Sequence, residues 1–188
     1  MEVLLGLLTV GPMSGYGLGQ AVRTSIGHFW HESYGQIYPN LKRLAAAGFI
    51  TGREERRKGR PTRLVYSITG KGRERLAAWL AVDPQPEVPR NELLLKLFFG
   101  AQATPRTVTC FVERMAASER AILKRFAGIE KEIARNSRFP DAPYWRMALR
   151  FGQLELAAHQ RWARETLAEL HRLGGTKDPA RKRKGGKS

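Results

Sequence analysis

The side chains with the clearest chemistry in this sequence are cations gathered around a Gly-Arg-Pro turn at residues 59–61. Long cationic side chains at a narrow turn suit phosphates or the minor groove of DNA, where arginine follows the negative potential. A charged, solvated turn is the alternative, but the defined turn favours a nucleic-acid contact. The cations concerned are Arg56, Arg57, Lys58, Arg60 and Arg63.

A helix with a polar face is predicted immediately before this turn, at residues 33–48. Ser33 can cap its first turn, and Gly48 ends it. Apolar side chains recur inside it at the spacing of one buried face, so the side chains between them lie on the flanks or the opposite face. The buried set is Ile37, Leu41 and Leu44, and the outer set is Gln36, Tyr38, Lys42 and Arg43.

The outer set has the chemistry of a helix that reads DNA. The major groove of B-DNA admits one helix, whose outward side chains reach the base edges. Gln36 can read a base edge, and Tyr38 can contact a phosphate or a thymine methyl group. Lys42 and Arg43 suit phosphates, which position a protein without specifying sequence. A solvated polar face is the alternative, and the basic turn that follows weakens it.

Two strands are predicted on either side of the basic turn. The first covers Phe49–Glu54, and the second covers residues 64–68, where inward and outward side chains alternate. The turn itself is predicted at Arg56–Pro61. We expect Glu54 and Glu55 to pair with neighbouring arginines or to face away from DNA. A helix followed by a basic two-stranded hairpin is the order found in a winged helix.

Further helices are predicted around this unit. One covers Glu2–Val10, and a second runs from its cap at Ser14 to about Thr24. Thr69 can cap another, which contains Leu76–Leu80. Pro39 lies inside the helix at residues 33–48, but close enough to its start for the lost hydrogen bond to be tolerable.

The segment Val82–Arg90 holds three prolines in nine residues and is predicted to be a linker. It separates a winged-helix domain at residues 1–81 from a second domain at residues 91–173. Residues 174–188 are rich in Gly, Lys and Arg and have almost no apolar side chain to bury. We expect that tail to be disordered.

The second domain is predicted to be all helical, which gives a mainly α (α+β) protein. Asn91 can cap a short helix, and two long apolar series follow, Val108–Ile133 and Ala148–Leu170, separated by a break at Asn136–Pro143. Two long amphipathic helices have more apolar surface than they can cover alone. Coiled-coil-like packing in a homodimer is therefore expected.

Charge indicates a polyanionic partner. The 188 residues include 33 Lys and Arg against 17 Asp and Glu, a net charge of +16. Residues 1–81 hold 12 basic and 5 acidic side chains, whereas residues 82–176 hold 15 and 11. The first domain therefore suits phosphate and the second suits protein. No apolar run reaches the roughly 18 residues of a membrane span. The opening residues lack the pattern of a signal peptide. A single cysteine fits a reducing cytoplasm.

Catalysis and cofactors have little support in the sequence. No nucleophile elbow or phosphate-binding glycine loop is present, because the glycines at 15–19 follow a predicted helix and not a strand. Three or four converging metal ligands are also lacking, so no metal or other cofactor is expected. Cys110 is most simply a small buried hydrophobe, with thiol pairing across a dimer axis as the alternative.

Several motifs resemble the PadR family of transcriptional regulators: GPMSGYGL at 11–18, SYGQIYPNLKRLAAAGFI at 33–50, the GRP turn, and LVYSITGKGRERL at 64–76. The second domain is similar to the dimerisation domain of one branch of that family. The resemblance implies a winged helix-turn-helix that binds DNA, an obligate homodimer and, usually, repression. The family's recognition-helix motif maps onto Tyr34, Gln36, Tyr38, Pro39 and Leu41, and its wing tip onto Gly59, Arg60 and Pro61.

The resemblance also raises a small-molecule effector, since some family members respond to aromatic or drug-like molecules, phenolic acids among them. Aromatic side chains of the second domain could line an apolar pocket for such a molecule, although residues at helical spacing are more often plain core. The candidates are Phe98, Phe111, Trp145 and Trp162.

These observations favour a cytoplasmic homodimer that binds double-stranded DNA at a palindromic operator, with half-sites about 10 bp or a multiple apart. Residues 33–48 of each protomer would enter a major groove. The main alternative is a nucleoid-like or RNA-binding protein that responds to charge alone. An enzyme is a distant third hypothesis, and a membrane-surface role lacks an apolar helix face beside the basic tail.

Overall fold

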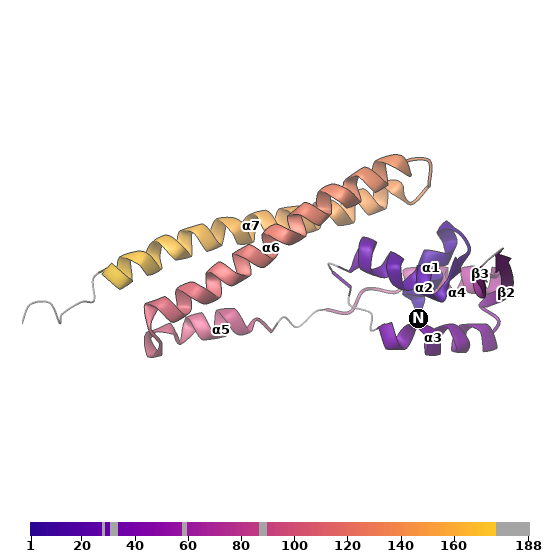
Figure 1. Ribbon diagram of the computed structural model, residues 1–188, viewed down its shortest axis with the longest axis horizontal. Helices are drawn as coiled ribbons and strands as arrows, with labels where there is room; N and C mark the ends of the chain where they lie inside the picture. The colour runs from indigo at the N-terminus through magenta and orange to yellow at the C-terminus, as the bar shows by residue number, and fades with distance from the viewer. Residues whose placement is uncertain (28, 31–33, 58–59, 87–89, 176–188) are drawn as a thin grey trace, which may run out of the picture. The chain divides into compact units, whose positions relative to one another are not determined.

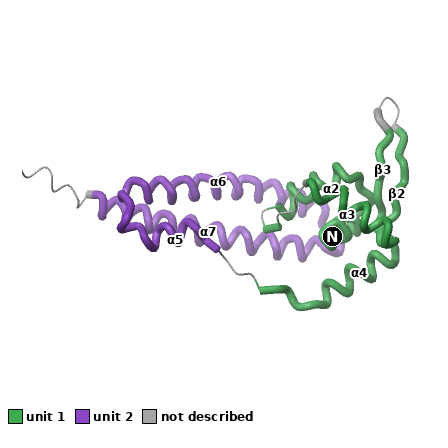
Figure 2. Tube along the Cα trace, turned by 90° about the horizontal axis from the view of Figure 1, so that it is seen from below, with its two compact units in different colours: residues 1–86 green, residues 87–188 purple. Residues whose placement is uncertain are grey.

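The computed structural model describes residues 1–27, 29–30, 34–57, 60–86 and 90–175 (Figure 1). The chain forms two compact units, Met1–Pro86 and Glu87–Ser188, coloured separately in Figure 2. The boundary between the two units falls inside the predicted proline-rich linker. The Ser33 cap and the Lys58–Gly59 turn lie outside the described residues, as does the tail from residue 176 onward.

The first unit is a helical layer with a small sheet. Its elements in chain order are α1 (Glu2–Val10), β1 (Met13–Ser14), α2 (Gly15–Ala21), a π-helical segment (Val22–Ile26), α3 (Tyr34–Ala46), β2 (Ile50–Arg57), β3 (Arg60–Ile68) and α4 (Gly70–Leu80). The strands are antiparallel in the order β1-β3-β2, with Ile50 opposite Ile68 and Glu55 opposite Arg63. This is the helix and hairpin order of a winged helix.

One apolar core holds these elements together. It is built from α1, α2, α3 and the start of β2, so the helix before the hairpin is fixed from three sides. Burying each of these side chains stabilises the unit by roughly 1.5–3 kcal/mol relative to leaving it in water. The buried residues are Leu4, Leu5, Leu8, Leu18, Ile37, Leu41, Leu44 and Ile50.

The hairpin differs from the prediction in its strand ends. The predicted turn at Arg56–Pro61 is too long, because β2 continues to Arg57 and β3 already begins at Arg60. The ladder shifts register between Glu55 and Arg57. This shift lies beside Pro61, which has no N–H to donate to a regular ladder. Strand β1 was not predicted, since two residues are too few to show a period.

The start of α4 is bonded to the end of α3. Gly48 has a φ of 73°, the left-handed conformation that ends many helices. The Thr69 hydroxyl donates to the Gly48 carbonyl oxygen at 2.8 Å and accepts from the Gly72 N–H at 3.1 Å. The Thr69 N–H donates to the Phe49 carbonyl oxygen at 3.0 Å. A Cβ at Gly72 would lie only 2.1 Å from that same oxygen, so only glycine fits there.

The second unit is an antiparallel helical pair with a short helix beside it. Asn91 caps α5 (Glu92–Phe98) by accepting from the Leu94 N–H at 3.0 Å, and Thr104 caps α6 (Pro105–Arg135). The second long helix, α7 (Ala142–Gly175), starts inside the predicted break. It also includes Gly174 and Gly175, which were wrongly placed in the tail, because the last turn of a helix needs no apolar side chain of its own.

Two apolar clusters join α6 to α7. The first includes Val108, Val112, Ala163 and Leu170, and the second is made of Phe126, Ile133, Leu149 and Leu156. Residues early in α6 meet residues late in α7, which establishes the antiparallel arrangement.

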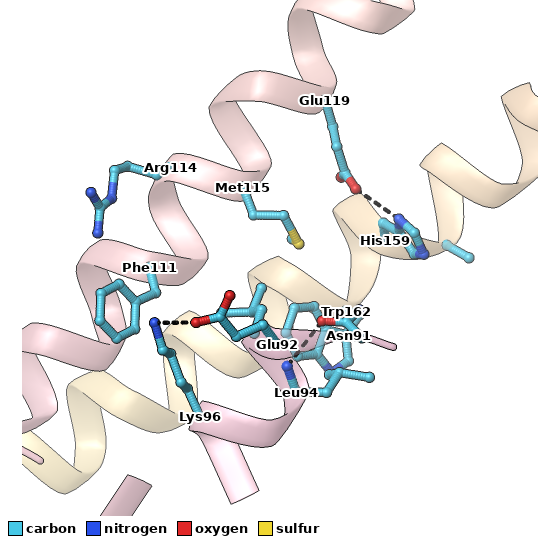
Figure 3. Close-up of a pocket in the computed structure, with 12 residues that line it drawn as sticks. Asn91, Glu92, Leu94, Lys96, Phe111, Arg114, Met115, Glu119, His159 and Trp162 are labelled. Atoms are coloured by element: carbon cyan, nitrogen blue, oxygen red, sulfur yellow. Dashed lines mark hydrogen bonds and ion pairs between the residues drawn. The ribbon is translucent and has the colours of Figure 1, made fainter. Parts of the chain in front are cut away.

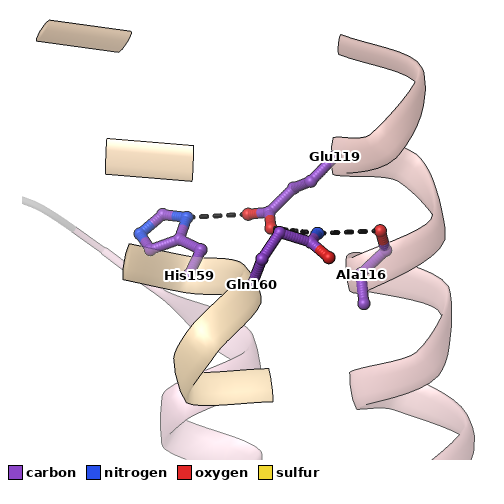
Figure 4. Close-up of polar contacts among 4 residues, drawn as sticks. All are labelled: Ala116, Glu119, His159 and Gln160. Atoms are coloured by element: carbon purple, nitrogen blue, oxygen red, sulfur yellow. Dashed lines mark hydrogen bonds and ion pairs between the residues drawn. The ribbon is translucent and has the colours of Figure 1, made fainter. Parts of the chain in front are cut away.

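A polar layer lies between the two clusters (Figure 4). The Glu119 carboxylate, whose side chain is 10% exposed, is bonded to His159 Nδ1 at 2.7 Å and to Gln160 Nε2 at 3.2 Å. Gln160 Nε2 also donates to the Ala116 carbonyl oxygen at 2.9 Å. Because a shift of either helix would leave this buried carboxylate unsatisfied, the layer fixes the register of α6 against α7.

The prediction that Cys110 is buried was wrong, since its thiol is exposed. The buried positions of α6 nearest to it are Val108 and Val112. Cys110 lies two residues from each, about 200° around the helix, and therefore on the opposite side.

Gly72→Ala should lower the free energy of unfolding by at least about 2 kcal/mol, since the added methyl group meets a backbone oxygen that cannot move aside cheaply. Gly70→Ala is the matched control, because a Cβ there has no atom within 4 Å. Thermal unfolding of the full chain, followed by circular dichroism, measures both. Equal midpoints for the two variants would contradict the close packing of α4 on the end of α3.

Candidate nucleic-acid interface

The outer face of α3 is polar, as its periodicity predicted. Gln36, Lys42 and Arg43 are exposed, and Tyr38 is 55% exposed, while the inner side chains of the helix lie in the core. At 100° per residue, Gln36 and Arg43 share one flank of this face, and Tyr38 and Lys42 share the other. The face thus carries an amide, a phenol and two cations, which suits base edges between phosphates.

The centre of the same face carries only small side chains. Gly35, Pro39 and Ala46 lie between the two flanks, and all three are exposed. Small side chains along the crest let the backbone of a helix approach a groove closely, so that longer side chains on the flanks reach the groove walls. Pro39 is accommodated inside α3, which runs unbroken from Tyr34 to Ala46.

Tyr38 is positioned by groups outside α3. A Cβ at Gly15, the first residue of α2, would lie 2.7 Å from Tyr38 Cε1 and 3.1 Å from Cζ, so the ring rests directly on that glycine. Tyr66 of β3 also lies nearby. Burial raises the pKa of the Tyr66 hydroxyl, and the nearby Tyr38 raises it further. Tyr38 therefore has a fixed place at the edge of the exposed face.

The hairpin presents cations on the side away from the core. Residues paired across a ladder share a face, so Arg53, Glu55, Arg63 and Val65 lie together, opposite the face that carries Tyr66 and Ile68. Arg63 Nε pairs with Glu55 Oε2 at 2.5 Å, as expected for this glutamate. Both side chains remain more than one-third exposed, so the pair is weak and can open toward a phosphate.

The structure therefore brings together part of the predicted set. Gln36, Tyr38, Lys42 and Arg43 share the outer face of α3, and Arg63 lies on the hairpin. Tyr34 begins α3, Arg57 ends β2, and Arg60 begins β3 opposite Arg57. Ser33 and Lys58 lie outside the described residues.

Two positions were missed by sequence reasoning. Arg53 is exposed on the same face of the hairpin as Arg63, and its period-two spacing from Glu55 was the available signal. Gly15 carries no signal in the sequence, because its contact with Tyr38 joins residues far apart in the chain.

A cavity of about 730 Å³ lies in the second unit between α5, α6 and α7 (Figure 3). Of the predicted pocket residues, Phe111 and Trp162 line it. Phe98 does not, since it is 82% exposed and meets Phe99 edge to face at 5.1 Å. Trp145 packs on the second α6–α7 cluster instead, beside Phe139. Helical spacing alone could not separate these four aromatic residues.

Among the described residues, neither a membrane-spanning helix nor a cluster of metal ligands is found. None of their helices combines the length and apolar character needed to cross a membrane. Nowhere in the described part of the chain do three His, Cys, Asp or Glu side chains gather as metal ligands.

Comparison with known proteins gives two family matches. Residues 4–78 match the transcriptional regulator PadR-like family, and residues 89–171 match the virulence activator alpha C-terminal family. The two matches lie on either side of the segment 79–88, one in each unit.

Individual relatives agree with these matches. The probable transcriptional regulator Rv1176c of Mycobacterium tuberculosis is 36% identical over 128 residues, which is 63% of this chain and 68% of that protein. The negative transcriptional regulator PadR of Bacillus subtilis is 37% identical over 97 residues, 51% of this chain. That alignment spans only about half of the Bacillus protein, 53%.

Solved structures extend the likeness to the whole fold. Bacillus subtilis PadR in complex with operator DNA superposes with a TM-score of 0.75 at 26% identity, covering 90% of this chain and 97% of that one. The Vibrio cholerae virulence activator AphA gives a TM-score of 0.70 at 25% identity, covering 92% and 98%. The family matches, the Mycobacterium relative and the winged-helix geometry together show that this chain belongs to the PadR-like family of transcriptional regulators.

Proposed function

We propose that this protein is a cytoplasmic, homodimeric repressor that binds a palindromic operator in double-stranded DNA and is released from it by a small aromatic effector. The observation that carries the proposal is the outer face of α3, a polar and cationic surface held rigidly by an apolar core and followed directly by a basic hairpin. A helix in the major groove with a cationic wing beside it contacts bases and backbone together.

The candidate DNA contacts divide by chemistry. Gln36 and Tyr38 read bases, and the cations bind phosphates. Those proposed to contact the backbone or the minor groove are Lys42, Arg43, Arg57, Lys58, Arg60 and Arg63, with Ser33 and Tyr34 at the start of the helix.

Relatives support this assignment. Bacillus subtilis PadR is a negative regulator and has been solved with operator DNA and with p-coumaric acid. The AphA protein is instead named an activator. We infer repression here, because the more similar relative with a stated sign of regulation is a negative regulator.

Dimerisation is supported by an exposed apolar stripe on α7. Tyr144, Met147, Phe151 and Leu154 follow one another at steps of three, four and three residues and are all more than half exposed. Such spacing places them on one face of the helix, turned away from the clusters shared with α6. A second copy of the chain can cover this stripe, and two-fold symmetry then presents two α3 helices to two half-sites. An effector that changed the separation of those helices would release the DNA.

Binding to the protein's own promoter and to a scrambled duplex, at two salt concentrations, tests the proposal. We expect a preference for the promoter of about 10³ or more, retained at the higher salt. Gln36→Ala should lower that preference by about tenfold or more, because a lost base contact is worth about 1–3 kcal/mol. Lys42→Ala should weaken binding to both duplexes alike. It should also reduce by about one the slope of the logarithm of affinity against the logarithm of salt concentration.

Lys131→Ala, an exposed change on α6, is the control and should alter neither quantity. Equal binding to both duplexes, lost together as salt rises, would overturn site-specific regulation at that promoter. That result would favour the alternative hypothesis, a nucleoid-like or RNA-binding protein that responds to charge alone.

Gly15→Ala should weaken promoter binding by about as much as Tyr38→Ala does, because the added methyl group displaces the Tyr38 ring. The fold should persist, because the Tyr38 ring edge can move aside and the Leu41 methyl carbon, 3.3 Å from the new Cβ, needs only a small shift. Fluorescence anisotropy with labelled promoter DNA measures the affinity. Gly6→Ala in α1, where a Cβ meets nothing within 4 Å, is the control. Unchanged affinity in Gly15→Ala would show that the position of Tyr38 does not matter for binding.

Phe151→Glu should convert the dimer to a monomer, because it places a charge in the centre of the apolar stripe, where Phe151 is 69% exposed in the single chain. Sedimentation velocity at micromolar protein measures the change. Ala157→Glu adds the same charge at an exposed position of α7 about 120° away and should remain dimeric. Dimers of equal stability in both variants would place the interface elsewhere.

A further inference from the structure

The cavity in the second unit has an apolar side and a charged end, both built from the same helices (Figure 3). Met115 lies one turn from Glu119 on α6, and Trp162 lies one turn from His159 on α7. Since the two helices are antiparallel, the thioether and the indole lie on the same side of the polar pair. A planar ring can therefore rest against Met115 and Trp162 with its substituent directed at Glu119.

The charge at that end is negative and desolvated. The Glu119 side chain is 10% exposed and is bonded to the His159 imidazole and the Gln160 amide, neither of which is a permanent cation. A carboxylate removed from water is stabilised best by a full positive charge. A cationic group on a ligand can therefore stabilise the Glu119 carboxylate better than the imidazole does.

Only one of the two partners can easily leave. Gln160 is anchored, since its amide bonds both the carboxylate and the Ala116 carbonyl oxygen. His159 holds the carboxylate by one ring nitrogen, and its side chain is 47% exposed. The imidazole can turn into solvent and vacate Oε1, while Gln160 keeps its bonds to the carboxylate and to the Ala116 carbonyl oxygen.

The two cations that line the cavity, Lys96 and Arg114, contact groups other than Glu119. Lys96 Nζ pairs with Glu92 Oε1 at 2.7 Å and lies 5.3 Å from the centre of the Phe111 ring. The Arg114 guanidinium lies 5.3 Å from the same ring. Phe111 is eight residues from Glu119, about 12 Å along α6. Both cations are exposed, so solvent screens their repulsion of a second positive charge.

We propose that this cavity binds a small aromatic ammonium compound, with its ring between Met115 and Trp162 and its ammonium group in the place of the His159 ring on Glu119. An aromatic carboxylate of the same size would set its charge against a buried carboxylate and is disfavoured. Binding would displace a residue of the layer that fixes α6 against α7. Its use as the effector signal rests on the proposed function, whereas the binding site itself does not.

Ligand-observed NMR with the full chain, without DNA, at neutral pH tests the site. The probe is 2-(2-naphthyl)ethylamine, and 3-(2-naphthyl)propanoate is the anion of matched size. We expect the amine to bind at least about tenfold more tightly than the acid. Glu119→Gln should weaken binding of the amine by about tenfold or more. Glu130→Gln, the same change at an exposed site of α6, should leave the affinity for the amine unchanged.

His159→Ala separates the proposed role from a structural one. It removes the group that competes for Glu119, so the amine should bind as tightly or more tightly, even if the variant is less stable. Three results would each overturn the proposal. The acid could bind more tightly than the amine, Glu119→Gln could bind the amine as tightly as the unchanged protein does, or a folded His159→Ala variant could lose binding of the amine. The promoter titration is a separate measurement, so failure of DNA binding and failure of this site are distinguishable.

Discussion

The burial of Ile37, Leu41 and Leu44 beneath α1 and α2 is the constraint on which the first unit depends. A helix with three side chains fixed in a core cannot rotate about its axis. A rotation of about 100°, the angle between successive residues, would place apolar groups in water and polar groups in the core. The same contacts therefore decide which side chains face outward. The bonds from Thr69 to the end of α3 add a second anchor at the opposite end of the helix.

The two units expose different kinds of side chain. The first unit concentrates exposed cations on α3 and the hairpin, where phosphate can replace water as their partner. The second unit exposes apolar side chains on α7. A surface that binds DNA and a surface that binds a second copy need opposite properties, and separate units let each be satisfied without weakening the other.

Polar groups stabilise this protein in two different ways. The Glu55–Arg63 pair is exposed, contributes at most about 1 kcal/mol, and can be exchanged for a contact with phosphate. The Glu119 layer is buried, and removing one partner would leave a charge without compensation. The first arrangement suits an exchangeable surface, and the second suits a fixed register that a bound molecule can disturb.

Sequence by itself determined what depends on neighbours a few residues away. The bounds of α1, the caps at Ser14, Thr69 and Asn91, and the inner and outer faces of α3 all rest on contacts within one or two turns, and all were predictable from spacing. Tertiary structure alone decided the contact of Gly15 with Tyr38, the pairing of Glu119 with His159, and which aromatic residues line the cavity. Those contacts join residues 23 to 40 or more positions apart, and periodicity along one helix cannot indicate which face of another helix it will meet.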